Sequence, residues 1–466
     1  MQKNKKKLLL TLLLALFLYF AYCLFFSKNT EIKIISFNDF HGSIEDKNNV
    51  GAEKFFNFIK ENTDNNTIVV SAGDNFQGEL ISNYFFGLPV IDFFKEINLY
   101  FSAIGNHEFD WGIEKVNNEW KDIKFLSANV LKNKKLLTKP YLIKEIDGVK
   151  IGFIGLTTQE SYYKVDKKRL KDIEILDPVE TAKKHVKILK KQGVNSIILV
   201  CHIGTYLDDN GDIKFENKNL EELTKIKGVD LIISGHSHKE LLGQLNDVFI
   251  IQSGSKGKFV GITKIMFKNK KIVNISIENI NLLDNKNQLK SNLKIKKIID
   301  KYNQKLKNEG YLDIMFKLNK DFIYSREKLN DLGIFICNNL RKNTNTNIVI
   351  LNSGSIRKSL FKGNITKKDI YELLPFQNDL VEVKLKGNTL IENILRNQHI
   401  MQYIGFYIKN NQVFLNNGEK IDKNKYYNIL TNDFILNKGD NFNFKDFKII
   451  KNCGRISDLL IKSLEN

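Results

Sequence analysis

The sequence predicts an α/β layered domain followed by a smaller unit of mixed helix and strand. From residue 31 onward, short apolar runs rich in β-branched residues each end in small and polar residues, which is the pattern of buried strands. Segments with helical spacing, such as Ala52 to Glu61 and Val179 to Gln192, lie between several of these runs. This alternation is typical of sheets covered by helices. The predicted strands are Ile32 to Phe37, Thr67 to Ser71, Phe101 to Ile104, Lys124 to Ala128, Ser196 to Val200, Asp230 to Ser234 and Val248 to Gln252.

The remaining elements follow from turn signals and spacing. Tyr141 to Leu156, with Asp147 and Gly148 at its middle, predicts a β-hairpin, and we expect the first domain to cover residues 28–285. Residues 286–319 then form a linker with a connecting helix that ends at Gly310. Residues 320–466 are long enough for a core of their own. The apolar positions of the connecting helix are Ile295, Ile298, Ile299, Tyr302 and Leu306.

Composition and charge exclude several classes of protein. The chain has 466 residues, of which 42% are hydrophobic and 27% charged, so neither a disordered chain nor a polytopic membrane protein fits. The formal net charge is +19, but the lysines are spread over every segment rather than clustered, so we expect no nucleic-acid partner. The cysteines are far apart and lack paired spacing, which argues against a disulfide framework or a zinc ribbon.

The N-terminal segment, residues 1–27, predicts export. A lysine-rich start is followed by an uninterrupted apolar run from Leu8 to Phe26, which is the pattern of a signal peptide or a membrane anchor. We favour an uncleaved anchor, because the run is longer than that of a cleavable signal and ends in bulky residues. In both cases the rest of the chain would be extracytoplasmic, in the periplasm or at the cell surface.

Five of the seven histidines lie directly after, or within a few residues of, predicted strands, and each has further ligand-type residues beside it. Loops that leave the carboxyl ends of neighbouring strands converge on one crevice, so ligands that are far apart in the sequence can meet there. The segments are Asn38-Asp39-Phe40-His41, Gly73-Asp74, Gly105-Asn106-His107-Glu108, Cys201-His202 and Gly235-His236-Ser237-His238. His185 and His399 lack such company, and we expect both to be structural or surface residues.

These residue types indicate a hydrolytic metal centre. Imidazole, carboxylate and amide ligands without thiolate suit Zn, Mn, Fe, Ni or Co, and Mg also remains a candidate. Their number argues for two divalent ions, whose identity the sequence leaves open. Two-metal sites stabilise both the attacking and the leaving oxygen of an in-line displacement, which suits a phosphate ester as substrate.

The ordered series DFH, GDNFQG, GNHEFDWG, CHIG and GHSH resembles the 5'-nucleotidase family of calcineurin-like metallophosphoesterases. This family includes bacterial 5'-nucleotidases, 2',3'-cyclic phosphodiesterases and UDP-sugar hydrolases. Beyond residue 320, the segments NSGSIR, LPFQN and TNDF with a later GD resemble the family's substrate-binding domain. The resemblance implies a four-layer α/β/β/α metallophosphoesterase sandwich, followed by a smaller mixed α/β nucleotide-binding domain at residues 320–466.

Carried over motif by motif, the resemblance implies a role for each residue of the centre. One ion would be held by Asp39, His41 and His238, and the other by Asn106, His202 and His236, with Asp74 as the bridge. His107 and Asp110 would form the catalytic pair that stabilises charge on the transferring phosphoryl group.

In the second domain, the resemblance implies a nucleotide site. Arg326 and Arg357 would bind phosphate, and the rings of Phe376 and Phe434 would hold the base between them. Asn378 and Asp440 would make polar contacts to the nucleoside.

Two departures from the family pattern leave the choice of substrate open. Phe322 stands where some members carry an additional arginine. The family's glycine-rich stretch reads Gln398-His399-Ile400-Met401-Gln402 here, and Gly405 is its first glycine.

The resulting prediction is an extracytoplasmic two-metal phosphohydrolase that cleaves nucleoside 5'-monophosphates to nucleoside and phosphate by in-line attack of a metal-held hydroxide. Hydrolysis of 2',3'-cyclic nucleotides, 3'-nucleotides or UDP-sugars at the same site is the nearest alternative. A non-catalytic nucleotide-binding or adhesion protein would be expected to lack some ligands, yet every expected ligand position is filled. The sequence leaves the oligomeric state open.

Overall fold

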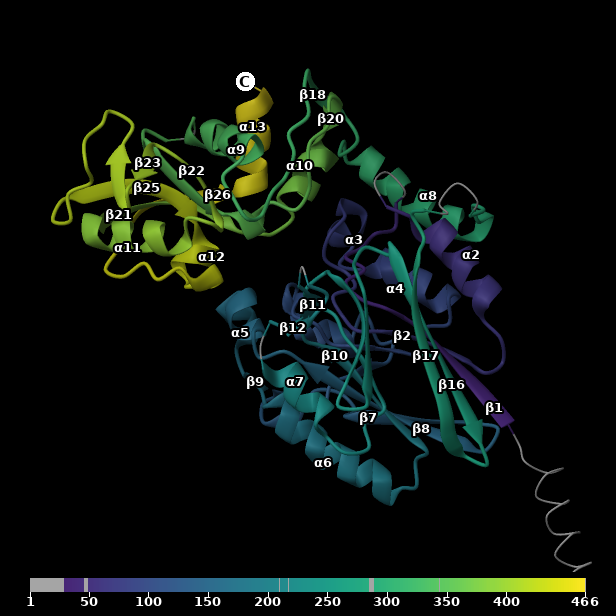
Figure 1. Cartoon of the computed structure of the whole chain (residues 1–466). Coiled ribbons are helices and arrows are strands. Elements are labelled where there is room, and N and C mark those ends of the chain that lie inside the picture. The colour runs from purple at the N-terminus through teal and green to yellow at the C-terminus, as the bar shows by residue number, and fades with distance from the viewer. Residues whose placement is uncertain are drawn as a thin grey trace, which may run out of the picture.

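The computed structural model describes residues 29–45, 49–208, 210–216, 218–284, 289–342 and 344–465 (Figure 1). The predicted signal peptide or anchor at residues 1–27 lies outside this part of the chain. Among the described residues, no helix combines the length and the apolar character needed to cross a bilayer.

The N-terminal domain contains two six-stranded sheets. The first has the order β17-β16-β1-β2-β3-β4, in which β1 to β4 are parallel and β16 runs antiparallel to β1. These strands are β1 (Asn29–Phe37), β2 (Thr67–Ser71), β3 (Phe101–Ala103), β4 (Phe125–Leu126), β16 (Phe259–Lys268) and β17 (Lys271–Asn281). The four predicted strands of this sheet are therefore confirmed, while the β16–β17 hairpin was not among the predictions.

The second sheet has the order β14-β15-β13-β10-β8-β7. Its four inner strands are parallel and its two edge strands are antiparallel to their neighbours. The predicted hairpin at Tyr141 to Leu156 is confirmed as β7 and β8. The strands are β7 (Tyr141–Ile146), β8 (Val149–Thr157), β10 (Ser196–His202), β13 (Leu231–Ile233), β14 (Glu240–Leu245) and β15 (Val248–Ser253).

The two sheets pack face to face, and helices cover their outer faces. Alternate residues such as Ile34 and Val70 of the first sheet share one core with Phe153 and Val200 of the second. Such alternation is expected where each strand presents one face to the facing sheet and the other to helices. Helices α2 (Ala52–Asn62), α4 (Leu88–Glu96) and α8 (Leu293–Asn308) cover the first sheet, and α6 (Pro178–Lys191) and α7 (Lys218–Thr224) the second. The predicted four-layer α/β/β/α sandwich is confirmed.

The N-terminal domain also contains short helices and strands outside its two large sheets. The helices are α3 (Leu80–Tyr84) and α5 (Ser161–Lys164). The strands are β5 (Val130–Lys132), β6 (Lys135–Leu136), β9 (Ile173–Ile175), β11 (Thr205–Leu207) and β12 (Ile213–Phe215).

The C-terminal domain is built on a five-stranded sheet of order β22-β19-β25-β21-β26, with one core on each face. Its strands are β19 (Ile348–Asn352), β21 (Asp379–Lys386), β22 (Met401–Ile404), β25 (Tyr426–Asn432) and β26 (Lys448–Arg455). Two hairpin-like pairs flank it, β18 (Ile314–Leu318) with β20 (Gly363–Thr366), and β23 (Phe406–Lys409) with β24 (Gln412–Leu415). The helices are α9 (Asp331–Arg341), α10 (Lys367–Leu373), α11 (Gly387–Asn397), α12 (Asp433–Leu436) and α13 (Ile456–Glu465).

Helix α8 and a set of aromatic contacts connect the domains. The predicted connecting helix is confirmed as α8, which packs on α2 and α4 through apolar residues including Ile295 and Tyr302. Beyond it, the ring of Tyr311 lies between Tyr84 of one domain and Tyr371 of the other, with centroid distances of 5.1 and 5.3 Å. In Figure 1, β18, β20 and α10 lie next to α8 on the side where the two domains meet.

Candidate metal centre and active site

The candidate ligands lie at one edge of both sheets. Asp39 and His41 follow β1, Asp74 follows β2 and Asn106 follows β3, while His202 ends β10. His236 and His238 follow β13, the parallel neighbour of β10. The carboxyl ends of parallel strands point the same way, so these side chains from both sheets meet in one place.

The first cluster consists of Asp39, His41 and His238, whose ligand atoms all lie within 4.8 Å of one another. His238 Nε2 is 3.3 Å from Asp39 Oδ1 and 3.0 Å from His41 Nε2. Asp39 Oδ1 is buried and has no hydrogen-bond partner among the described residues. This carboxylate oxygen is buried, receives no hydrogen bond from the described residues and faces two imidazole nitrogens. Together these three atoms form a ligand set that suits a divalent cation.

The second cluster consists of Asp74, His202 and His236, with the same mutual limit of 4.8 Å. His202 Nε2 lies at its centre, 3.1 Å from Asp74 Oδ2, 3.2 Å from Asn106 Oδ1 and 3.2 Å from His236 Nδ1. The structure thus brings all seven predicted ligand residues into two adjacent groups, and these residues fit two divalent ions.

The outer nitrogens of two ligand histidines are held by the backbone. His41 Nδ1 donates to the carbonyl oxygen of Gln77, and His202 Nδ1 to that of Ala72, both at 2.8 Å. A carbonyl oxygen only accepts hydrogen bonds, so Nδ1 carries the proton and Nε2 presents its lone pair to the cluster.

Backbone strain is concentrated at the same residues. Five of the seven candidate ligands have φ between 49° and 83°, in the left-handed region that residues other than glycine adopt only uncommonly, although aspartate and histidine do so more often than most. Such strain persists only where the surrounding structure enforces it, and it collects at functional sites. The five residues are Asp39, His41, Asp74, His236 and His238.

Close packing of loops holds Asp74 in place. A Cβ atom at Gly105 would lie 2.2 Å from Asp74 Oδ1, so only glycine fits at this position of the GNHE segment. Glu108 accepts hydrogen bonds from the backbone N–H groups of Asp74 at 2.9 Å and Gly105 at 2.6 Å. Burial, with a further contribution from Asp74, raises the pKa of Glu108 to about 7.

The buried carboxylates and imidazoles perturb one another strongly. Burial alone would raise the pKa of Asp39, but His238 holds it below its usual range. Burial opposes protonation of His202, yet Asp74 raises its pKa to about 10. Both carboxylates therefore require a nearby positive charge, which a divalent cation supplies without protonating the ligands.

His107 and Asp110 form a hydrogen-bonded pair beside the second cluster. His107 Nδ1 lies 2.8 Å from Asp110 Oδ2, and His107 Nε2 lies 4.0 Å from Asp74 Oδ2. Burial favours the neutral ring, but Asp110 and then Asp74 outweigh it and raise the pKa of His107 above its usual value. The two carboxylates favour the protonated ring, and the contact through Nδ1 leaves Nε2 as the ring nitrogen that faces away from Asp110.

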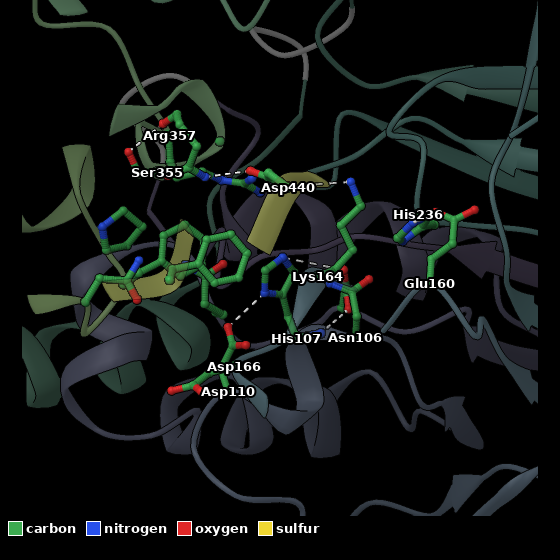
Figure 2. Close-up of a pocket in the computed structure, with 18 of the residues that line it drawn as sticks. Asn106, His107, Asp110, Glu160, Lys164, Asp166, His236, Ser355, Arg357 and Asp440 are labelled. Carbon is green, nitrogen blue, oxygen red and sulfur yellow. Dashed lines mark hydrogen bonds and ion pairs between the residues drawn. The ribbon is translucent and has the colours of Figure 1, made fainter. Parts of the chain in front are cut away.

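A cavity of about 280 Å³ lies between the domains and connects these residues with the second predicted site. Figure 2 shows Arg357, Ser355 and Asp440 on its upper side and Asn106, His107 and Asp110 on its lower side. All six predicted substrate residues line this cavity: Arg326, Arg357, Phe376, Asn378, Phe434 and Asp440. Residues from two separate domains therefore face the same space as the catalytic pair.

Several of the substrate residues are in contact with the site or with one another. The ring of Phe376 stacks near that of His107, with centroids 5.9 Å apart, and the Arg357 guanidinium lies 5.7 Å from the Phe376 centroid. Asp440 Oδ2 accepts a hydrogen bond of 2.6 Å from Asn352.

The two departures from the family pattern do not lie in the cavity. Phe322 packs in the core of the C-terminal domain, with its ring centroid 4.8 Å from that of Phe335. Gln402 is buried and donates to the carbonyl oxygen of Lys328 and to Ser353 Oγ, both at 2.9 Å.

Several charged cavity residues were not predicted from the sequence, among them Glu160, Lys164 and Glu216. Glu160 lies 3.1 Å from His236, and Lys164 Nζ lies 3.9 Å from Asp440 Oδ1 across the domain boundary. The position of Glu160 just beyond β8, the strand beside β10, is a signal that could have drawn attention to it.

Comparisons with known proteins agree with this architecture. The family model for calcineurin-like phosphoesterases matches residues 32–240, and that for the 5'-nucleotidase C-terminal domain matches residues 315–446. Together the two models cover well over half of the chain. The 5'-nucleotidase precursor of Thermus thermophilus has the same fold, with a TM-score of 0.82 and 24% identity over 94% of this chain and 96% of that one.

The alignments with curated relatives cover most of this chain but only part of each relative. The trifunctional nucleotide phosphoesterase YfkN of Bacillus subtilis is 27% identical over 416 residues, which are 78% of this chain but 27% of that protein. The cell wall protein Lmo0130 of Listeria monocytogenes is 27% identical over 90% of this chain and 65% of that protein. The 5'-nucleotidase of Rattus norvegicus is 26% identical over 78% of this chain and 71% of that protein. This chain thus spans about a quarter of the length of YfkN and about two thirds of that of Lmo0130.

Both family models match in the expected order, and the residues of their motifs converge on one cavity with two clusters of candidate metal ligands. The chain belongs to the 5'-nucleotidase family of calcineurin-like metallophosphoesterases, which are hydrolases of phosphoric esters that use two divalent metal ions.

Proposed function

We propose that this protein is an extracytoplasmic phosphohydrolase that cleaves nucleoside 5'-monophosphates to nucleoside and phosphate. The observation that carries the proposal is one cavity lined by members of both candidate metal clusters, the His107–Asp110 pair, two arginines and two phenylalanines. A phosphate ester attached to an aromatic base matches the chemistry of these groups.

In this proposal the seven ligand residues hold two divalent ions. Asp39, His41 and His238 would hold one and Asn106, His202 and His236 the other, and Asp74, which lies in the second cluster, would be the bridge that the family resemblance implies. Bound there, the ions would supply Lewis-acid stabilisation and a nucleophilic water for in-line displacement at phosphorus.

The chain's own residues bind the phosphate and stabilise its charge. His107, kept protonated by Asp110, donates its Nε2–H toward the oxygen on which negative charge develops. Arg326 and Arg357, which belong to the C-terminal domain, bind the phosphate oxygens. Since these donors are fixed before the reaction, little reorganisation is needed at the transition state.

The C-terminal domain recognises the nucleoside. Phe376 and Phe434 provide the apolar faces for the base, while Asn378 and Asp440 provide polar contacts. The hydrogen bond from Asn352 fixes Asp440 through Oδ2, and Oδ1, which lies 3.9 Å from Lys164 Nζ, would accept from a hydroxyl of the ribose.

Export of the protein is part of the proposal. The lysine-rich start and the apolar run from Leu8 to Phe26 support it, and the name of one relative, a cell wall protein of Listeria monocytogenes, is consistent with it. The N-terminal segment would attach the protein to the membrane if it is not cleaved.

A second candidate is hydrolysis of 2',3'-cyclic nucleotides, 3'-nucleotides or UDP-sugars at the same site. The name of one relative, a trifunctional nucleotide phosphoesterase, favours it, because the same metal centre would serve several esters.

An assay that measures both consumption of the substrate and release of phosphate separates these candidates, because opening a cyclic phosphate or cleaving UDP-glucose does not itself release phosphate. The purified protein is tested with AMP, 3'-AMP, 2',3'-cyclic AMP and UDP-glucose, each with several divalent metals, and Asp74→Asn serves as the inactive control. The proposal predicts the highest kcat/KM for AMP. A higher kcat/KM for a cyclic nucleotide or for UDP-glucose would replace the main proposal by the second candidate.

A further inference from the structure

His236 differs from the other ligand histidines in how its outer ring nitrogen is held. Its Nδ1 faces the second cluster, 3.2 Å from His202 Nε2. Its Nε2 lies 3.1 Å from a carboxylate oxygen of Glu160 and 3.8 Å from one of Glu216. Figure 2 shows the side chains of Glu160 and His236 directed toward each other. The outer nitrogens of His41 and His202 instead meet backbone carbonyls.

The chemistry of imidazole determines which way the proton goes. A neutral ring has one N–H and one lone pair, and the nitrogen that binds a metal must present the lone pair. If Nδ1 of His236 faces the ion, Nε2 carries the proton and donates it to Glu160. The reverse tautomer would turn an N–H toward the second cluster and leave two carboxylates facing a lone pair.

The backbone of Glu160 is tied to the metal centre. The N–H of Thr158 donates to the carbonyl oxygen of His202 at 3.1 Å, and the N–H of Glu160 donates to Thr158 Oγ1 at 3.2 Å. The carbonyl oxygen of Glu160 then accepts from Lys164 at 3.1 Å within α5. The backbone of Glu160 is therefore held at a fixed place relative to His202, a proposed ligand of the same ion, and this limits where the carboxylate can lie.

His236 needs such support because its backbone is strained, with φ of 83°. The second carboxylate, Glu216, approaches only because residue 204 is glycine: a Cβ atom there would lie 1.7 Å from Glu216 Oε2. At 3.8 Å from Nε2, Glu216 is too far for a hydrogen bond but adds negative charge beside the N–H.

We propose that Glu160 is a positioning residue, which fixes the ring orientation and the tautomer of His236 so that Nδ1 binds the second ion. The proposal rests on the metal-binding role given to His236 in the proposed function. Carboxylates that accept from the outer nitrogen of a ligand histidine also increase the basicity of the metal-binding nitrogen.

Metal affinity tests the proposal independently of substrate. Metal-free protein is titrated with zinc in the presence of a competing chelator, so that the two binding steps are resolved. We compare the wild-type protein with Glu160→Ala and Glu160→Gln, and with Glu174→Ala as the control, because Glu174 is an exposed glutamate on the nearby strand β9.

We expect Glu160→Ala to weaken one binding step by about 10- to 100-fold, the usual effect of removing such a partner, and to leave the other step unchanged. Glu160→Gln should lose less zinc affinity in that step, because its amide oxygen still accepts a hydrogen bond from the Nε2–H of His236. Both variants should still bind two ions at saturation, and the control should match the wild type.

Two results would overturn the proposal. If both binding steps of Glu160→Ala equal those of the wild type, Glu160 does not position His236. If the variant binds one ion fewer at saturating zinc, Glu160 is itself a ligand, and the group of Glu160, Glu216 and His236 holds an ion of its own. Failure of the proposed function would appear separately, as wild-type protein that binds two ions but releases no phosphate from nucleotides.

Discussion

At the scale of single residues, the candidate centre combines strained backbone with buried charge. Five candidate ligands have left-handed φ values, and the carboxylates of Asp39 and Asp74 are almost completely buried. Neither feature stabilises a fold by itself, since strain of this kind costs about 1 to 3 kcal/mol per residue. The arrangement is therefore explained by the ions that it can hold, rather than by packing.

His107 is the residue whose substitution separates catalysis from metal binding. If it acts only on the transition state, His107→Asn should lower kcat by about 100-fold or more, the scale of one lost electrostatic stabiliser. The measurement combines steady-state kinetics with AMP and elemental analysis of the same sample. The metal content should not change, and loss of one ion in the variant would instead make His107 a ligand.

The sequence predicts the candidate metal ligands better than it predicts the residues that hold those ligands in position. Histidines that follow buried strands together with Asp, Asn and Gly predict a metal site at the carboxyl ends of the strands, because these ends converge in parallel sheets generally. Glu160 has no such company in the sequence. Its role depends on the pairing of β8 with β10 and on the tautomer of His236, both of which are set by contacts between distant segments.

At the scale of elements, the short helix α12 and the turn after it form part of the proposed nucleoside site. Phe434 lies on α12 and lines the cavity, and a Cβ atom at Gly439 would lie 2.3 Å from its ring. The glycine allows the turn to pack directly against the ring, which fixes the face that Phe434 offers to a base.

Phe434→Ala tests whether this face binds the base. Stacking of an aromatic side chain on a base contributes about 1 to 3 kcal/mol, so kcat/KM for AMP should decrease by roughly 5- to 150-fold. Ribose 5-phosphate, which has no base, serves as the matched substrate and should be hydrolysed almost as before. An equal decrease for both substrates would mean that the substitution loosens the domain, and no decrease for either would place the base elsewhere.

The elements themselves show what sequence patterns can and cannot reveal. The seven predicted strands and the three predicted helices are present, because β-branched runs and helical spacing reflect burial that is local to each element. The β16–β17 hairpin was not predicted. Its turn at Asn269 and Lys270 has two positive φ values, 50° and 65°, but contains no glycine to signal it.

At the scale of the whole molecule, buried charges join the two domains. Lys368 is almost completely buried and forms ion pairs with Glu45 of the N-terminal domain and with Glu372 of its own helix. The N–H of Leu80 in α3 donates to Glu372 at 3.2 Å, and Lys358 pairs with the same carboxylate at 2.8 Å. The two contacts that cross the domain boundary, Lys368 with Glu45 and Leu80 with Glu372, join residues 323 and 292 positions apart, so no local pattern predicts how the domains pack.

Glu79 gives this interface a dependence on pH. Burial, and then repulsion from Glu372, raise the pKa of Glu79 well above its ordinary value. A carboxyl group with a raised pKa in the folded state contributes stability at low pH, and this contribution is lost as the pH rises through the raised pKa. Glu79→Gln keeps an oxygen that accepts from the N–H groups of Ile44 and Glu45. Because glutamine does not ionise, this variant should not lose stability as the pH rises.

Thermal unfolding at pH 5 and pH 8 measures this effect. The Tm of Glu79→Gln relative to the wild type should be higher at pH 8 than at pH 5. Glu174→Gln, at an exposed position, is the control and should show no such difference. A Tm difference for Glu79→Gln that is the same at both pH values would contradict the assignment.

The central claim is that two ions between the domains drive hydrolysis of a nucleotide, and a metal titration of activity tests it most directly. Metal-stripped protein receives zinc or manganese in steps, and phosphate release from AMP is measured against bound metal per chain. We predict no release without metal, a maximum at two ions per chain, and loss of both metal affinity and turnover in Asp74→Asn, because Asp74 belongs to the second cluster and is the proposed bridge between the ions. Full activity at one ion per chain, or in metal-free protein, would contradict the account.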